Sequence, residues 1–359
     1  MQADSGEALR EIVTAAVRIG ASDLHLSVGT PPAVRVSHEL KPLPGATFMT
    51  AAFINEAVSL LAGLDGREIT PEVSEVSFSV SFETGLRLKV NVFYQKGLPA
   101  ISIRFIPKEI KTIAELGLPP TLKQFTTLRR GLVIIAGPYG SGRSTTVASL
   151  IEEINRTRRD YIMTLERPIE HIFTSKLSII EQIEVGRDTP SFEQALNYLR
   201  HEDVDVLMLS ELPSASVIRQ VLDVANSGLL VFAEVNAETA TGVISKLVNS
   251  FEGHEQNLIS RLLSEVLSGI IVERLVKETG GGEIPALELL ISTDAVRLAL
   301  REGRIENIDN IIQTSARDGM VTLDRYLLEL VKRHRVSLED ALKQAVNPQA
   351  LEKLLKRAG

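Results

Sequence analysis

The 359-residue sequence contains no cysteine and no tryptophan. The lack of cysteine excludes disulfides, thiolate zinc sites, iron–sulfur clusters and cysteine nucleophiles. Aromatic residues make up only 4% of the chain, so we expect no stacking platform for nucleic-acid bases. The 46 acidic residues outnumber the 39 basic ones and give a net charge of −7, which disfavours general nucleic-acid binding.

Long hydrophobic runs are missing as well. None approaches the roughly 20 residues that span a bilayer, so we expect no direct insertion into a membrane. The first residues, Met1-Gln2-Ala3-Asp4, lack the features of a signal peptide, and we expect a cytoplasmic protein. One apolar stripe indicates a core or ring-packing face because polar residues interrupt it: Leu262, Leu263, Val266, Leu267, Ile270 and Ile271.

The hydrophobic pattern changes along the chain and predicts two domains. Residues 1–106 read as a small α+β domain, with helices near 9–17 and 51–64, several alternating strands, and a turn near Thr84 and Gly85. Prolines 107, 119 and 120 bracket a linker over 107–120. In 121–359, apolar strands at 132–136, 161–165, 206–209 and 229–235 alternate with helical patterns and precede a helical C-terminal region. This alternation predicts a parallel sheet covered on both faces.

A glycine-rich turn follows the first apolar strand of the second domain and opens a helix over about 144–155. It reads Gly137-Pro138-Tyr139-Gly140-Ser141-Gly142-Arg143-Ser144, followed by Thr145. In this context the backbone amides and the helix N-terminus form a cradle for phosphate, and the Ser144 hydroxyl is placed to bind Mg²⁺. An ordinary strand-to-helix turn would explain one glycine, but not three with a Ser-Thr-Thr run behind them.

The loop has arginine, Arg143, where such loops carry lysine. A guanidinium is wider and planar, so the exchange is not conservative at a shaped phosphate site. The backbone cradle would still bind nucleotide, but stabilisation of the transition state would suffer, because phosphoryl transfer depends on positioning and electrostatics.

The chain resembles the type II/IV secretion ATPases, most closely the PilT/PilU-like ATPases of type IV pilus retraction and twitching motility. The resemblance covers nearly the whole chain. Besides the loop, its motifs are Ala21-Ser22-Asp23-Leu24-His25-Leu26-Ser27, Lys89-Val90-Asn91-Val92-Phe93, Ile103-Arg104-Phe105-Ile106-Pro107, Ala295-Val296-Arg297-Leu298-Ala299-Leu300-Arg301-Glu302 and Gly319-Met320-Val321-Thr322-Leu323-Asp324.

This resemblance implies an α/β protein with a RecA-like P-loop NTPase core and a smaller PAS-like N-terminal domain. It also implies a homohexamer, or a mixed ring with related pilus ATPases, that uses ATP and Mg²⁺. Its partner would be the inner-membrane platform protein of the pilus machine, so the protein would be peripheral at that membrane.

The resemblance assigns catalytic candidates. Glu166, in the acidic box Thr164-Leu165-Glu166-Arg167-Pro168-Ile169-Glu170, falls on the carboxylate expected to orient or deprotonate the attacking water. Glu211, in the Walker B segment, falls on the carboxylate that holds Mg²⁺, together with Ser144. Arg104 is the candidate finger that reaches a neighbour's nucleotide. Both glutamates follow apolar strands, where an α/β sheet places its ligand site.

Several of these motifs depart from the family pattern. Arg167 replaces an Asp, Ser210 a Gly and Pro213 an Arg; the histidine box Gly-Thr-Leu-His-Thr reads Ala233-Glu234-Val235-Asn236-Ala237. With Arg143, these departures favour a nucleotide-binding member with weak or lost hydrolysis, a pseudo-ATPase. The competing hypothesis is an active ATP-hydrolysing retraction motor, since Glu166, Glu211 and Ser144 are retained. A small-molecule phosphotransferase is disfavoured, because no acceptor-binding insertion is visible.

Overall fold

The computed structural model describes residues 5–36, 39–66, 69, 75–82, 86–199 and 201–358, with side chains up to residue 353. The turn predicted at Thr84 and Gly85 lies outside these residues. The chain divides into two compact units, one of Met1–Glu109 with Pro168–Ile172, the other of Ile110–Arg167 with Phe173–Gly359. Residues 110–120, which the sequence assigned to a linker, lie in the second unit, and Ile113 and Leu118 are buried in its core.

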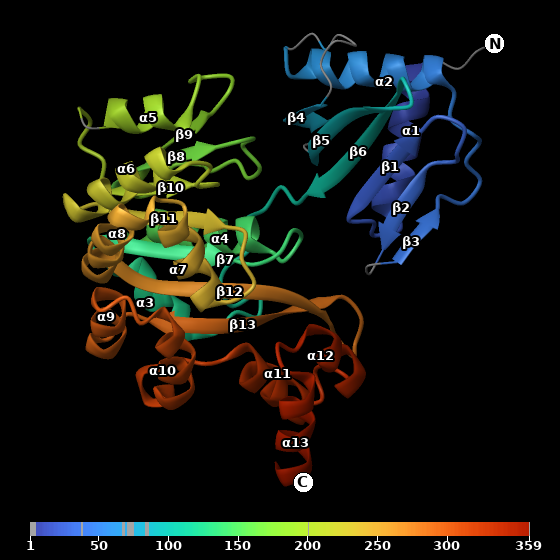
Figure 1. Cartoon of the computed structure of the whole chain (residues 1–359). Coiled ribbons are helices and arrows are strands. Elements are labelled where there is room, and N and C mark those ends of the chain that lie inside the picture. Colours follow the sequence, from blue (N-terminus) through green and yellow to red (C-terminus); the bar gives the residue numbers. More distant parts are fainter. Residues whose placement is uncertain are drawn as a thin grey trace. The chain divides into compact units, whose positions relative to one another are not determined.

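The first unit is an antiparallel sheet with two helices (Figure 1). Its sheet has the order β3-β2-β1-β6-β5-β4. The elements are α1 (Ser5–Arg18), β1 (Asp23–Ser27), β2 (Ala33–Val36), β3 (Glu39–Pro42), α2 (Ala51–Leu64), β4 (Glu75–Phe82), β5 (Leu86–Gln95) and β6 (Leu98–Ile106). The helix predicted near residues 9–17 is α1, and its apolar residues Leu9, Val13 and Ala16 are buried. The α+β interpretation is therefore confirmed, and β3 is added to it.

The segment Pro168–Ile172 belongs to the first unit although it follows the acidic box. Two side chains of β5 bind it. Arg87 donates from Nη2 to the Ile169 carbonyl (2.7 Å) and from Nε to the Glu170 carbonyl (2.9 Å). Lys89 Nζ lies 2.7 Å from Glu170 Oε1. The chain therefore returns to the first unit directly after Arg167.

The second unit is built on a seven-stranded sheet with the order β13-β12-β7-β11-β10-β8-β9. All neighbours are parallel except β12 and β13, which form an antiparallel pair. The strands are β7 (Gly131–Ala136), β8 (Tyr161–Glu166), β9 (Ile179–Glu184), β10 (Val206–Leu209), β11 (Leu230–Val235), β12 (Leu267–Lys277) and β13 (Glu283–Ile291). The parallel sheet predicted from the four apolar runs is confirmed.

Helices cover both faces of this sheet, because its central strands are apolar on both sides. Ile134 of β7 belongs to the core beneath α5–α10, whereas Val133 and Ile135 belong to the core beneath α3 and α4. The helices are α3 (Lys123–Thr126), α4 (Arg143–Thr157), α5 (Phe192–Leu199), α6 (Ala215–Asn226), α7 (Ala240–Asn249), α8 (Gly253–Val266), α9 (Asp294–Arg301) and α10 (Ile308–Thr314). Short 3-10 turns are η2 (Pro120–Leu122), η3 (Ile305–Asn307) and η4 (Ala316–Asp318).

A smaller cluster at the end of the β12–β13 hairpin is formed with α11 (Leu323–Lys332), α12 (Leu338–Gln344) and α13 (Pro348–Ala358) (Figure 1). The helical C-terminal region that the sequence predicts is thus confirmed. Within the described residues, no helix combines the length and the apolar character that crossing a bilayer requires.

The apolar stripe between Leu262 and Ile271 divides between two elements. Helix α8 ends at Val266, and β12 begins at Leu267, whose backbone is extended (φ −63°, ψ 124°). β-Branched residues follow and pair with β7. At Gly269 the ring of Phe125 lies so close that an added Cβ would meet it at 2.4 Å.

We expect Gly269→Ala to destabilise the second unit by about 1–3 kcal/mol, because the new methyl group overlaps the Phe125 ring in a packed core. Urea unfolding followed by circular dichroism measures this effect. Gly253→Ala is the control, because a Cβ at Gly253 meets nothing within 4 Å. Equal unfolding midpoints for the two variants would contradict the packing at Gly269.

Candidate functional site

The turn between β7 and α4 is shaped by close approach of β12. Gly137 (φ 154°) and Gly142 (φ 102°) take backbone conformations that favour glycine, and Gly142 is the N-cap residue of α4. A Cβ on Gly137 would lie 2.4 Å from the Glu273 carbonyl oxygen, and one on Gly142 would lie 2.7 Å from Glu273 Oε1. A side chain at Gly137 is therefore excluded by the backbone, and one at Gly142 would be strained by its positive φ and would have to displace the Glu273 carboxyl group.

The predicted nucleotide-binding residues, 137–145, lie together in this turn and the first turn of α4. The first amides of a helix have no intrahelical acceptor, so the turn retains the donors that a phosphate cradle requires. The Ser141 hydroxyl is buried and forms no hydrogen bond within the described part of the chain. Tyr139, by contrast, is 65% exposed at the tip of the turn. Their role in binding stays a prediction.

Arg143 is held among carboxylates of its own unit. Its Nε lies 3.9 Å from Oε2 of Glu234, on the neighbouring strand β11, and both side chains are largely buried. The charge of Arg143 also acts on Glu273 of β12, the strand on the other side of β7. The loop cation therefore already has anionic partners. Sequence reasoning assigned no role to either glutamate, although an acidic residue within an otherwise apolar strand is the signal that would have found them.

Glu273 is buried beneath the loop, with 3% of its surface exposed. Thr146 Oγ1, in α4, donates a hydrogen bond of 2.6 Å to its Oε2. Burial raises the pKa of Glu273 to about 7, although the Thr146 bond and the Arg143 charge act in the opposite direction. This carboxyl group ties β12 to the helix that carries the loop.

Glu166, the candidate for orienting water, is the last residue of β8 and is buried. Its Oε1 accepts hydrogen bonds from Thr164 Oγ1 (2.7 Å) and from Gln182 Nε2 of β9 (3.0 Å). These two donors hold the carboxylate in one orientation at the carboxyl edge of the parallel sheet. Neither donor was singled out from the sequence.

Glu211 follows β10 by two residues and carries an ion pair with Arg167. Both Nε and Nη2 of Arg167 lie 2.7 Å from Oε1 of Glu211. The backbone amide of Arg167 donates to Ser210 Oγ at 3.0 Å, and its guanidinium lies 5.3 Å from the centroid of the Phe192 ring. Two positions that depart from the family pattern, Arg167 and Ser210, are therefore in direct contact.

Mg²⁺ binding by Ser144 and Glu211 stays a prediction, and one oxygen of Glu211 is already engaged by a cation. Magnesium is held through carboxylate oxygens and repels nearby cations, whereas Oε1 of Glu211 already accepts two bonds from Arg167. Across the described residues, no group of three or more histidine, aspartate or glutamate side chains gathers to hold a metal.

Arg104 lies in β6 of the first unit. Its Nε donates to Oδ1 of Asp23 on the neighbouring strand β1 at 2.9 Å. Its side chain is 32% exposed. Its proposed action on a neighbouring subunit's nucleotide stays a prediction.

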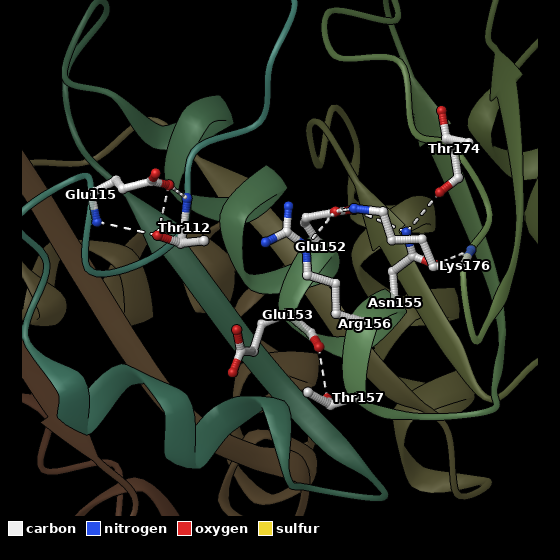
Figure 2. Close-up of polar contacts among 9 residues, drawn as sticks. All are labelled: Thr112, Glu115, Glu152, Glu153, Asn155, Arg156, Thr157, Thr174 and Lys176. Atoms are coloured by element: carbon white, nitrogen blue, oxygen red, sulfur yellow. Dashed lines mark hydrogen bonds and ion pairs between the residues drawn. The ribbon is translucent and has the colours of Figure 1, made fainter.

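The far end of α4 is anchored by polar contacts to the segment before β9 (Figure 2). Glu152 accepts hydrogen bonds from Lys176 and from Arg156 Nε. Asn155 donates to the Thr174 carbonyl and accepts from the Lys176 amide, both at 2.9 Å. With Glu273 at its start, α4 is thus fixed at both ends, which positions the phosphate loop.

Comparison with known proteins decides the family. The family described as "Type II/IV secretion system protein" matches residues 3–349. The chain belongs to this family. The type IV pilus retraction ATPase PilT of Pseudomonas aeruginosa is 34% identical over 95% of this chain and 99% of its own length. The type IV pilus ATPase PilU of the same organism is 30% identical over 95% of this chain and 89% of its own.

A crystal structure of the pilus retraction motor PilT with bound ADP also matches this secretion-family chain. The TM-score is 0.80 and the identity 36%, over 96% of this chain and 98% of that one. The fold expected from the resemblance, an N-terminal domain followed by a RecA-like ATPase domain, is therefore confirmed.

We expect Glu273→Gln to change how stability depends on pH. The folded protein raises this pKa from 4.5 to about 7, so wild-type stability falls as pH rises through that window. The variant lacks this loss, so its free energy of unfolding exceeds that of the wild type by up to about 3 kcal/mol above pH 7. Near pH 4 the two free energies of unfolding are the same. Urea unfolding across pH measures the difference, with exposed Glu265→Gln as the control. A pH-independent difference would contradict the assignment.

Proposed function

We propose that this chain is a PilT/PilU-like component of the type IV pilus machine that binds nucleotide and hydrolyses ATP weakly or not at all. The observation that carries the proposal is that each guanidinium of the site is paired with a carboxylate of the protein. Arg143 lies against Glu234, and Arg167 against Glu211. The charges that would stabilise phosphoryl transfer are thereby engaged before any nucleotide arrives.

The electrostatics of phosphoryl transfer explain why this arrangement weakens catalysis. The transition state spreads negative charge over the transferred group and needs preorganised cations around it. Arg143 would have to leave Glu234 to meet that charge, and its planar head fills the space of a lysine ammonium poorly. Any Mg²⁺ on Ser144 and Glu211 would likewise have to displace Arg167.

Nucleotide binding itself is supported by the loop. Its glycines keep the conformation of a phosphate cradle, and α4 is fixed at both ends. The related pilus motor PilT has been crystallised with ADP. ATP or ADP is therefore the ligand that we propose for residues 137–145, with Thr145 and Ser144 in the first helical turn.

The second candidate function is an active retraction motor. One observation favours it: Glu166 is held in a single orientation by Thr164 and Gln182, as a residue that aligns water requires. In that case Arg104 of a neighbouring subunit would meet the developing charge.

We expect steady-state phosphate release from ATP and Mg²⁺ to be no faster for the wild type than for Glu166→Gln. A wild-type rate that Glu166→Gln abolishes would establish the active motor and overturn the pseudo-ATPase proposal. Arg143→Lys, run beside them, tests the loop cation alone. In Arg143→Lys, Arg167 still pairs with Glu211. We therefore expect the combined Arg143→Lys, Arg167→Asp protein to release phosphate roughly tenfold or more faster than Arg143→Lys alone.

For assembly, we propose a homohexamer or a mixed ring with related pilus ATPases. It would dock on the inner-membrane platform protein from the cytoplasmic side. Closed cyclic rings are a common form of homo-oligomer. We expect mass photometry with ADP present to give a species of about six times 39.3 kDa. A monomer that enters a ring only after a related ATPase is added would favour the mixed ring.

A further inference from the structure

Arg167 and Glu211 follow adjacent parallel strands, β8 and β10, at the edge of the sheet where the phosphate loop also begins. Both guanidinium nitrogens that face Glu211 bind the same oxygen, Oε1, at 2.7 Å. Charge-assisted bonds of this kind are shorter and stronger than neutral ones. The pair, whose side chains are 48% and 39% exposed, therefore places a positive charge on the carboxylate that would otherwise face a bound nucleotide's metal.

The position of Arg167 is defined by more than this ion pair. Its backbone amide binds Ser210 Oγ (3.0 Å), which joins the ends of β8 and β10 directly. Its guanidinium lies over the ring of Phe192, at the start of α5, where a cation is attracted by the aromatic face. An arginine whose backbone amide binds a hydroxyl, and whose guanidinium contacts an anion and an aromatic ring, loses less freedom when a ligand binds beside it.

The positive charge of Arg167 could neutralise the phosphates of a bound nucleotide. The phosphates of ADP and ATP carry several negative charges, and proteins neutralise them with Mg²⁺, with lysine or with arginine. Arginine presents a fork of N–H donors that matches phosphate oxygens, and it keeps further donors free for this purpose after two of them have bound Glu211. A divalent cation placed on Glu211 would meet the repulsion of the guanidinium at the same oxygen.

We propose that Arg167 takes the place of the divalent cation, so that this chain binds metal-free ADP or ATP as well as it binds the magnesium complex. The inference rests on the proposed nucleotide binding and deepens it by naming the ionic form of the ligand. Arg167 acts here as a specificity-determining residue. It removes the requirement that the nucleotide arrive as a metal complex.

The test is a titration of the purified full-length chain with fluorescent ADP, and with unlabelled ADP as competitor, in excess EDTA and in excess Mg²⁺. For the wild type we expect the same affinity in both buffers, within about twofold. For Arg167→Asp we expect affinity in EDTA to fall roughly tenfold or more and Mg²⁺ to restore it, because the carboxylates are then free to hold the metal. Arg167→Lys keeps the charge and should stay within about threefold of the wild type in EDTA.

Arg219→Asp is the matched control. Arg219 also forms an ion pair with a glutamate, Glu255, and lies over an aromatic ring, Phe251, at 5.1 Å. Its reversal makes the same chemical change on α6, and we expect wild-type affinity in both buffers. The melting temperature of each variant reports whether a loss of binding comes from loss of fold.

Three results would overturn the inference in different ways. Wild-type binding that is tight in Mg²⁺ and at least about tenfold weaker in EDTA would show a metal-dependent site and leave nucleotide binding intact. No binding of ADP by the wild type in either buffer would remove the proposed function and this inference with it. Equal losses in both buffers for Arg167→Asp and Arg167→Lys would show that Arg167 is needed for structure rather than for charge.

Discussion

The close approach of β12 to the turn after β7 is the constraint on which the rest of the site depends. A side chain at Gly137 would meet the Glu273 backbone, and one at Gly142 would meet the Glu273 carboxyl group in a backbone conformation that favours glycine. The same carboxyl group receives the Thr146 hydroxyl and so fixes where α4 begins. Once it ionises, above its raised pKa of about 7, this buried acid acts strongly on neighbouring charges, because the environment is poor in water. Arg143 therefore lies in the field of Glu273 and Glu234.

Four of the departures from the family pattern lie in two contacting pairs, whereas Pro213 and Asn236 belong to neither pair. Arg143 and Glu234, which replace a lysine and a threonine, form one ion pair. Arg167 and Ser210, which replace an aspartate and a glycine, form another contact. Residues in direct contact are energetically coupled, so changes at one favour particular changes at the other.

Much of the fold could be predicted from the sequence, because its main signals are local. The apolar run of β7, the glycines after it and the Ser-Thr-Thr start of α4 specify a phosphate loop without reference to the rest of the chain. The stripe from Leu262 to Ile271 behaved differently, because a helix ends inside it and a strand begins. Its hydrophobicity alone fits both elements; the pairing of β12 with β7 decides between them. Contact with a distant strand is a tertiary effect that no local pattern contains.

The same distinction applies to the site. Glu166, Glu211 and Ser144 were found because each stands at a strand end or in a loop with a recognisable order. The sequence did not identify the partners of these residues, because each partner comes from a separate segment. These partners are Gln182 for Glu166, Glu234 for Arg143 and Arg167 for Glu211. The sequence shows that Arg167 reverses a charge of the family pattern. Its ion pair with Glu211 is visible only in the side-chain geometry.

The path of the chain through Pro168–Ile172 has a consequence for how this protein can be divided. The N-terminal unit is discontinuous, since a five-residue strip that binds Arg87 and Lys89 is encoded about sixty residues beyond its last strand. A fragment ending at Glu109 would expose two cationic side chains whose partners remain on the other fragment. The N-terminal unit is therefore not an autonomous module that gene fusion or truncation could transfer intact.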